Sequence, residues 1–324
     1  MKSPEVTIRQ VSMEWLGMKK LVVKQSTYAK YESIVGNHIA ECLGDIPLCR
    51  VNSAMVNAFA AEKMGIQPDG CRGNCEKGVM CAKTVRDICT ILKSIIRYGE
   101  NEYHLQNLVG NTVLPRAKAA EKEILNVNEV RKFERYLREN QDVPRCAGLL
   151  LCLYTGMRLG EICALKWTDI DLKTRTLCVS HTAQRIAAAA GEGLPRTVVI
   201  TDFPKTDASK RVIPIPDIVF PLIRSRFPGS GKDFYFLTNS PRLIEPRNYQ
   251  YFFEKALERA GVRRVNFHIL RHTFASRCVE AGMDVKTLSE ILGHSSTGIT
   301  LNYYVHSSME SKKKQLNRLR FGGR

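Results

Sequence analysis

The sequence predicts a mainly α-helical protein with a small antiparallel β-sheet, organised in two domains. Apolar residues recur at helical spacing through most of the chain, whereas alternating patterns are confined to short segments between residues 167 and 216. At 324 residues the chain is long enough to bury two hydrophobic cores. Its content of 44% apolar and 25% charged residues is ordinary for a folded protein.

Residues 1–105 are predicted to form a small helical bundle, the first domain. Ser26 and Thr27 offer an N-cap for the second helix, and glycines at 44 and 65 end the second and third helices. The four expected helices span residues 5–22, 28–44, 51–65 and 82–100. The fourth has the clearest apolar stripe, which consists of Val85, Ile88, Ile91, Leu92, Ile95 and Ile96.

The eleven cysteines are odd in number and scattered, which is typical of free thiols in a reducing cytosol. Cys71, Cys75 and Cys81 do cluster in and after a predicted loop over residues 66–78. Their spacing is not that of a zinc knuckle and no histidine is near, so we interpret them as incidental thiols rather than metal ligands. No apolar run is long enough to cross a bilayer and no secretory signal is visible, so we expect a cytoplasmic protein and no membrane partner.

Residues 126–324 are predicted to form the second domain, joined to the first by a weakly periodic linker over residues 106–125. Its first helix has a cap in Asn126 or Asn128. A strongly apolar helix follows, and Gly156 separates it from the next one.

Alternating segments then predict strands at residues 167–181, 196–202 and 211–216, with an alanine-rich hairpin excursion at 187–195. The rest of the domain is predicted to be helical with loops. It ends in a basic tail (residues 309–324), which is either a disordered solubilising end or a short helix that docks on DNA or on a neighbouring subunit.

The net charge of +17 is unusual and favours a polyanionic partner, with nucleic acid as the first candidate. Residues 127–324 hold 32 Lys and Arg residues against 19 acidic ones, a net charge of +13. The second domain is therefore predicted to be the more strongly attracted to phosphates. A basic surface that only keeps the protein in solution is the alternative.

Several residues of the second domain are of types that bind or attack a phosphate. Arg158 follows the Gly156 break. Lys205, Lys210 and Arg211 are candidates to reach over a bound duplex from the tip of a β-hairpin, although each is more often a solvated charge. His268 and Arg271 leave one face of a predicted helix, and His294 follows a glycine at a helix end. Each residue alone is more often structural: an ion pair with Glu161 for Arg158, a satisfied core position for each histidine.

Taken together, Arg158, Lys205, His268, Arg271, His294 and Tyr304 occur in an order that resembles the tyrosine recombinase family of phage-integrase type. The motifs that carry the resemblance are TGMRLGEICALKW, HILRHTFAS, and LGHSS followed by YVH. It covers the whole second domain, and the first resembles the core-binding domain of that family. Among its branches the chain is most similar to integrases of bacterial conjugative elements and phages, although it starts directly at the core-binding helices and an N-terminal arm-binding domain is not expected.

The resemblance implies a site-specific recombinase that cleaves and rejoins DNA through a 3′-phosphotyrosine, with no metal, cofactor or ATP. It implies that Arg158, Arg271 and His294 contact the phosphate, that Tyr304 attacks it, that His268 accepts the tyrosine proton and that Lys205 protonates the leaving 5′-oxygen. Glu161 is expected to brace Arg158. The implied partners are double-stranded DNA with inverted-repeat core sites, a homo-tetramer on that DNA in the bacterial nucleoid, and an accessory directionality factor.

Three alternatives stay open at this point. Tyr303 could be the nucleophile, since either spacing from His294 is compatible with the family. The Y-x-H context and Thr300 four residues earlier favour Tyr304, which would leave Tyr303 as a packing residue. His272 directly follows Arg271 and so points elsewhere, and we interpret it as structural. A type IB topoisomerase uses a similar residue set, and a catalytically silent DNA-binding protein could retain the same fold. The target sequence, the preference for integration or excision, and cleavage in cis or in trans are not readable from the chain.

Overall fold

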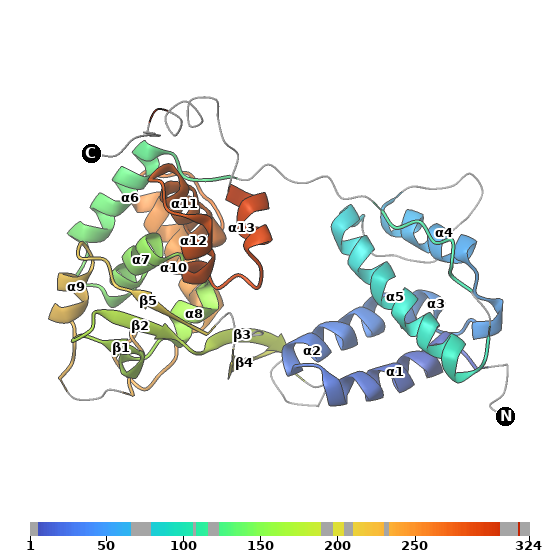
Figure 1. Cartoon of the computed structure of the whole chain (residues 1–324). Helices are drawn as coiled ribbons and strands as arrows, with labels where there is room; N and C mark the ends of the chain where they lie inside the picture. Colours follow the sequence, from blue (N-terminus) through green and yellow to red (C-terminus); the bar gives the residue numbers. More distant parts are fainter. Residues whose placement is uncertain are drawn as a thin grey trace, which may run out of the picture. The chain divides into compact units, whose positions relative to one another are not determined.

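The computed structural model describes residues 6–65, 79–105, 108–115, 123–188, 197–203, 210–229, 233–304 and residue 317. The chain divides into two compact units: Met1–Glu121 with Ile186–Val198, and Lys122–Arg185 with Val199–Arg324. Helices dominate both units, and all strands are short and antiparallel or paired in a hairpin (Figure 1). The predicted fold class is therefore confirmed. The boundaries that we predicted at residues 105 and 126 stay a prediction.

The first unit is a bundle of short helices around one apolar core. Its elements are α1 (Ile8–Val22), α2 (Gln25–Ile34), a π-helical turn (Val35–Ile39), α3 (Ala40–Leu43), α4 (Ser53–Lys63) and α5 (Ala82–Glu102). The whole predicted stripe of α5 is buried, because α5 packs against α1, α4 and the π-helical turn. The periodicity of apolar residues therefore located the longest helix and its inward face.

The predicted cap of the second helix was wrong. The backbone N–H groups of Thr27 and Tyr28 both bond to the carbonyl of Lys24, so Lys24 is the N-cap and α2 begins at Gln25. Lys24 makes no side-chain cap, and Ser26 lies in the first turn. The predicted helix over residues 28–44 is also interrupted by the π-helical turn. The segment 66–78, with Cys71 and Cys75, lies outside the described residues.

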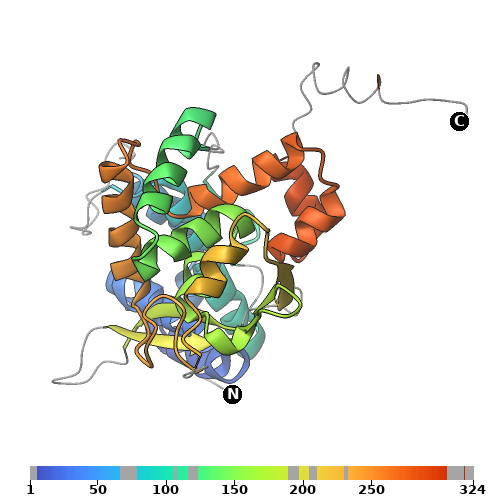
Figure 2. The same ribbon diagram turned by 90° about the vertical axis from the view of Figure 1, so that its left-hand side faces the viewer.

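The second unit is built around α7 (Pro144–Thr155), almost every residue of which is buried. It packs against α6 (Val127–Glu139), α10 (Pro246–Arg259) and α11 (His268–Glu280), as Figures 1 and 2 show. Asn126 caps α6 in a capping box with Glu129, one of the two predicted caps. The remaining helices are α8 (Leu159–Ala164), α9 (Phe220–Ser225), α12 (Val285–Leu292) and α13 (Thr297–Tyr304).

The strands of this part of the chain form two small sheets. In the first, β2 (Thr176–Val179) pairs antiparallel with both β1 (Ile170–Asp171) and β5 (Arg211–Pro214), with Leu177 opposite Ile213. The second is the hairpin of β3 (Thr182–Ala187) and β4 (Thr197–Asp202), and most of the predicted excursion between them lies outside the described residues. The strands at 170–171, 176–179, 197–202 and 211–214 fall inside the predicted segments.

Two glycines in the left-handed conformation end helices close to the predicted site residues. Gly156 has a φ of 66° at the end of α7, and Gly293 has a φ of 65° at the end of α12. A residue with a side chain is strained in that conformation, which is why glycine is favoured where a helix must stop and turn. Both turns leave the last helical carbonyls without partners in their own helix.

Candidate functional site

The end of α12 collects three arginines that are far apart in the sequence. The backbone carbonyls of Ile291, Leu292 and Gly293, here called the α12 carbonyls, accept hydrogen bonds from Arg211, Arg271 and Arg158 respectively. The carbonyl end of a helix carries partial negative charge and lacks intrahelical donors. A guanidinium supplies both a positive charge and several N–H donors, so arginine side chains bind favourably at this helix end.

Arg271 lies on the first turns of α11 and is 2% exposed. Its Nη1 donates to the carbonyl of Gly156 over 3.0 Å, and its Nη2 donates to that of Leu292 over 2.7 Å. The guanidinium therefore joins the end of α7 to the end of α12. Two helix ends hold it in one orientation before any ligand arrives.

Arg158 precedes α8, directly after the turn at Gly156. Its Nη2 lies 3.3 Å from the carbonyl of Gly293, and its Nη1 donates to Oε1 of Glu161 over 2.7 Å. The side chain is 35% exposed, so this guanidinium is open to solvent, whereas Arg271 is almost fully buried. The predicted pair of arginines thus meets at the same helix end, one buried and one partly open.

Glu161 is the buried carboxylate that compensates the positive charges of Arg158 and Arg211. It is 3% exposed and accepts from Nη1 and Nη2 of Arg211 over 3.1 and 2.9 Å, in addition to Arg158. Burial alone raises the pKa of Glu161, but the hydrogen bonds and positive charges of Arg211 and Arg158 outweigh burial and lower it to about 2. The carboxylate is therefore ionised, as a buried link between two guanidiniums.

Arg211 is the partner that sequence reasoning missed. We named it as one of three candidates at a hairpin tip, but the expected hairpin was wrong, because β4 pairs with β3 and β5 pairs with β2. Arg211 is 8% exposed and engaged with Glu161 and Ile291. The alternation of residues along β5 could have revealed this buried role, because Arg211 is on the same face of the strand as Ile213 and that face is buried. A charged residue at an inward strand position indicates a buried ion pair.

The two predicted histidines are adjacent to these arginines. His294 follows Gly293, and its Nδ1 lies 2.8 Å from Oγ1 of the buried Thr300 on α13. His268 begins α11, and its ring centroid lies 4.7 Å from that of His272 in an edge-to-face arrangement. His272, which we interpreted as structural, is thus in contact with a predicted site residue.

Both histidines are held in the neutral form. The pKa of His268 is lowered to about 4, first by loss of solvent around the ring and then by the charges of His272, Arg271 and Arg158. The pKa of His294 is also lowered to about 4, by burial and then by Arg271, Arg158 and Arg211. The charges that act on the two rings are largely the same, so one electropositive pocket contains both.

Of the remaining predicted site residues, Lys205 lies outside the described residues. Tyr304 is the last residue of α13, whose backbone packs against α12 and α11, and Tyr303 precedes it. Position 304 is one helical turn after Thr300, which bonds to His294.

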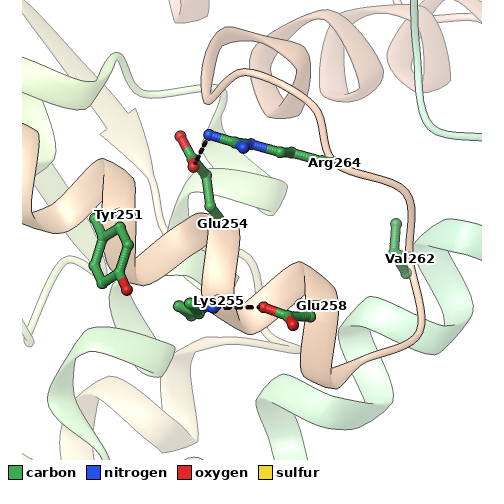
Figure 3. A pocket seen from close by; sticks show the side chains of 6 residues that line it. All are labelled: Tyr251, Glu254, Lys255, Glu258, Val262 and Arg264. Carbon is green, nitrogen blue, oxygen red and sulfur yellow. Dashed lines mark hydrogen bonds and ion pairs between the residues drawn. The ribbon is translucent and has the colours of Figure 1, made fainter.

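Other features of the described chain bear on metal binding, membrane association and ligand pockets. No group of three or more His, Cys, Asp or Glu residues that could hold a metal ion occurs among the described residues. Within the same residues, no helix is long and apolar enough to span a membrane. A pocket along α10 is lined by Tyr251, Glu254, Lys255, Glu258, Val262 and Arg264, and its charges are already paired (Figure 3).

The matches to protein families decide the relationship. Residues 123–311 match the model described as the phage integrase family, and residues 7–63 match the N-terminal SAM-like domain of phage integrases. The chain belongs to the phage integrase family of tyrosine recombinases. It is thus an enzyme of site-specific DNA recombination, as its motifs implied.

The similarity extends over most of this phage integrase. It is 28% identical to a XerC-like tyrosine recombinase of Caldanaerobacter subterraneus subsp. tengcongensis over 97% of this chain and 83% of that protein. It is 24% identical to the transposase of transposon Tn916 from Enterococcus faecalis over 69% of this chain, a match that spans 56% of that protein. The solved integrase of transposon Tn1549 in complex with a circular intermediate DNA shares its fold, with a TM-score of 0.76, 21% identity and coverage of 97% and 100%.

The buried carboxylate gives a first prediction. Glu161→Gln removes the charge that Arg211 and Arg158 share and leaves Arg211 buried without a counter-ion, so we expect the free energy of unfolding to fall by about 3 kcal/mol at neutral pH. Because the pKa of Glu161 is lowered to about 2 from its usual 4.5, its contribution is present above the usual value and is lost as pH falls toward 2. Urea-induced unfolding measures this change.

Glu258→Gln is the matched control, since Glu258 pairs with Lys255 on the exposed face of α10. It should leave the unfolding midpoint unchanged. An equal, small effect of both substitutions would mean that Glu161 is not the buried link described above.

The electropositive pocket gives a second prediction. In the free protein, histidine ring signals of His268 and His294 should titrate near pH 4 in NMR spectra, and Arg158→Gln should raise both pKa values toward 6.5 without reaching it, since loss of solvent is the larger cause. Arg224→Gln, on the exposed face of α9, should move neither. Titration of both rings near pH 6.5 in the unchanged protein would contradict the conclusion that one electropositive pocket contains both histidines.

Proposed function

We propose that the end of α12 is the phosphate site of the recombinase and that the pocket cleaves DNA by in-line attack of Tyr304 on the scissile phosphate. The observation that carries the proposal is the convergence of Arg158 and Arg271, 113 positions apart by their numbers, on adjacent carbonyls of one helix end. Two guanidiniums so placed can each offer N–H groups to the non-bridging oxygens of one phosphate. His294 borders the same place.

The charges of the pocket suit the transition state of phosphoryl transfer. Negative charge develops on the equatorial oxygens as the attacking and leaving oxygens align. Donors that are already oriented stabilise that charge without reorganising, and the backbone contacts of Arg271 supply this orientation. Arg158, being partly exposed, can close on the phosphate when DNA binds.

The proposed covalent step uses three side chains, those of Tyr304, His268 and Lys205. The phenolic oxygen of Tyr304 forms a bond to phosphorus, and the bond from phosphorus to the 5′-oxygen breaks. His268 accepts the phenolic proton, and Lys205 gives a proton to the 5′-oxygen. The neutral His268 of the free protein is the form that can accept a proton, and an anionic phosphate bound beside it raises its low pKa during the step.

Rejoining uses the same atoms in reverse. A 5′-hydroxyl from a second duplex attacks the 3′-phosphotyrosine, and the phenol leaves. One phosphodiester replaces another, so the exchange needs no external energy source. We propose that it takes place on two inverted-repeat core sites bound by four copies of the chain in the bacterial nucleoid, with an accessory directionality factor, and that the basic charge contacts the DNA backbone.

The motif context supports Tyr304 over Tyr303 as the nucleophile. Tyr304 has the Y-x-H context with His306 and lies four residues after Thr300, whose hydroxyl contacts His294. A shift of one position turns the direction of a helical side chain by about 100°, so only one of the two tyrosines can attack the phosphate. The two alternatives, a topoisomerase and a silent DNA-binding protein, are not favoured by the family matches.

A suicide substrate tests the reaction and its nucleophile. The substrate is a duplex carrying an inverted-repeat core from the DNA that flanks the gene, nicked so that a short leaving strand diffuses away. Religation then fails and a covalent protein–DNA adduct accumulates. We expect Tyr304→Phe to abolish the adduct seen on denaturing gels and Tyr303→Phe, the matched control, to retain it.

Each other outcome identifies a different error. An adduct lost in Tyr303→Phe but kept in Tyr304→Phe would exchange the two roles. If the unchanged protein formed no adduct on any flanking inverted repeat although it bound the DNA, the silent DNA-binding alternative would be correct.

A further inference from the structure

The ring of His268 lies against the ring of a second histidine on the same face of α11. His268 and His272 are four positions apart in this helix, so both side chains leave one face of it. Their ring centroids lie 4.7 Å apart, and the two ring planes are nearly perpendicular, at 87°. Perpendicular rings in contact attract one another, because the edge of one is positive and the face of the other is negative. The contact therefore favours one orientation of the two rings.

The His268 side chain needs such a contact to be oriented. It occupies the first position of α11, where the preceding residue, Phe267, makes no side-chain cap. Among the residues that the structure describes, no hydrogen bond holds the His268 ring, and its ring contact is the one with His272. Loss of the His272 ring would thus leave the imidazole of His268 freer to turn about its side-chain bonds.

The backbone that carries His272 is fixed on both sides. Arg271 precedes it, and its guanidinium donates to the carbonyls that end α7 and α12. Thr273 follows it, is 1% exposed, and accepts a hydrogen bond at Oγ1 from the backbone N–H of Leu125 over 3.0 Å. Two buried neighbours with hydrogen bonds to other segments hold this part of α11 in place. His272 therefore offers its ring to His268 from a rigid support.

The charges around His268 place the pair in the electropositive pocket. Loss of solvent is the larger cause of the lowered pKa of His268, and the charge of His272 is the next. Arg271 and Arg158 act in the same direction, and Glu161 opposes them. A proton on His272 would oppose a proton on His268, so His272 can assist proton transfer to His268 only as a neutral ring.

We propose that His272 is a positioning residue for His268: its ring, carried by the fixed part of α11, keeps the imidazole of His268 oriented toward the phenolic proton of the attacking tyrosine. The inference rests on the proposed function, in which His268 accepts that proton from Tyr304. His272 itself neither touches the DNA nor exchanges a proton. Displacing a catalytic group by about 1 Å loses much of its effect, so removal of the ring contact slows the step that needs the proton acceptor.

A more acidic nucleophile separates this role from a general structural one. Fluorine atoms on the phenol lower its pKa from about 10, so trifluorotyrosine in place of Tyr304 gives up its proton with less help from an acceptor. On the suicide duplex, we expect His272→Ala to form adduct about 5- to 20-fold more slowly when the nucleophile is tyrosine. With trifluorotyrosine as the nucleophile, His272→Ala should stay within about twofold of the protein that keeps His272.

Three further variants make the comparison specific. His268→Ala should show the same pattern with a larger loss on tyrosine, about 100-fold or more. His272→Phe keeps an aromatic ring at this position and should form adduct within about twofold of the unchanged protein. His181→Ala removes another contact between a histidine and an aromatic ring, since the centroids of His181 and Phe203 lie 5.0 Å apart, and should change neither rate.

The proposal is overturned if His272→Ala slows the reactions of both nucleophiles equally, or slows neither. It is also overturned if His272→Phe is as slow as His272→Ala, because the ring contact would then not be what matters. If trifluorotyrosine does not rescue His268→Ala, His268 is not the proton acceptor, and the proposal fails with that assignment. All these results leave the Tyr304-dependent adduct of the unchanged protein intact, so they are distinguishable from failure of the recombinase reaction itself.

Discussion

The capture of three guanidiniums by the carbonyl end of one helix is the constraint on which the rest of this structure depends. Arg158, Arg271 and Arg211 come from the start of α8, from α11 and from β5, and they meet at Ile291, Leu292 and Gly293. Like charges gathered so closely repel one another unless negative groups lie between them. The partial charge of the helix end and the full charge of Glu161 provide that compensation.

These negative groups do not fully balance the positive charge of the three arginines. One buried carboxylate and four carbonyls accompany three cations. The pocket therefore keeps a positive field, which acts together with loss of solvent to lower the pKa of both nearby histidines to about 4. An anionic phosphate would complete the balance. The same field that keeps the imidazoles neutral in the free protein therefore favours the substrate, and binding it changes the proton affinity of the rings. In the proposed reaction, affinity for DNA and readiness for proton transfer therefore have a common electrostatic origin.

Much of this could be predicted from the sequence, and the exceptions have physical reasons. The stripe of α5, the Asn126 cap and the glycine break at 156 depend on neighbours in the chain, and local pattern located them. The start of α2 was misplaced, because Ser26 and Thr27 suit a cap but the carbonyl of Lys24 accepts the first bonds. The role of Arg211 was missed because its partners are 50 and 80 positions away. The identity of the site residues came from a motif order, whereas the α12 carbonyls that unite them carry no sequence signal at all.

The most direct test of the central claim is a crystal structure of the Tyr304→Phe protein bound to its intact core site. If the account is right, the scissile phosphate lies at the end of α12, with the guanidiniums of Arg158 and Arg271 each within hydrogen-bond distance of its non-bridging oxygens and His294 beside it. A phosphate bound elsewhere, with the two arginines still facing only the α12 carbonyls and Glu161, would show that their convergence is structural and would contradict the account.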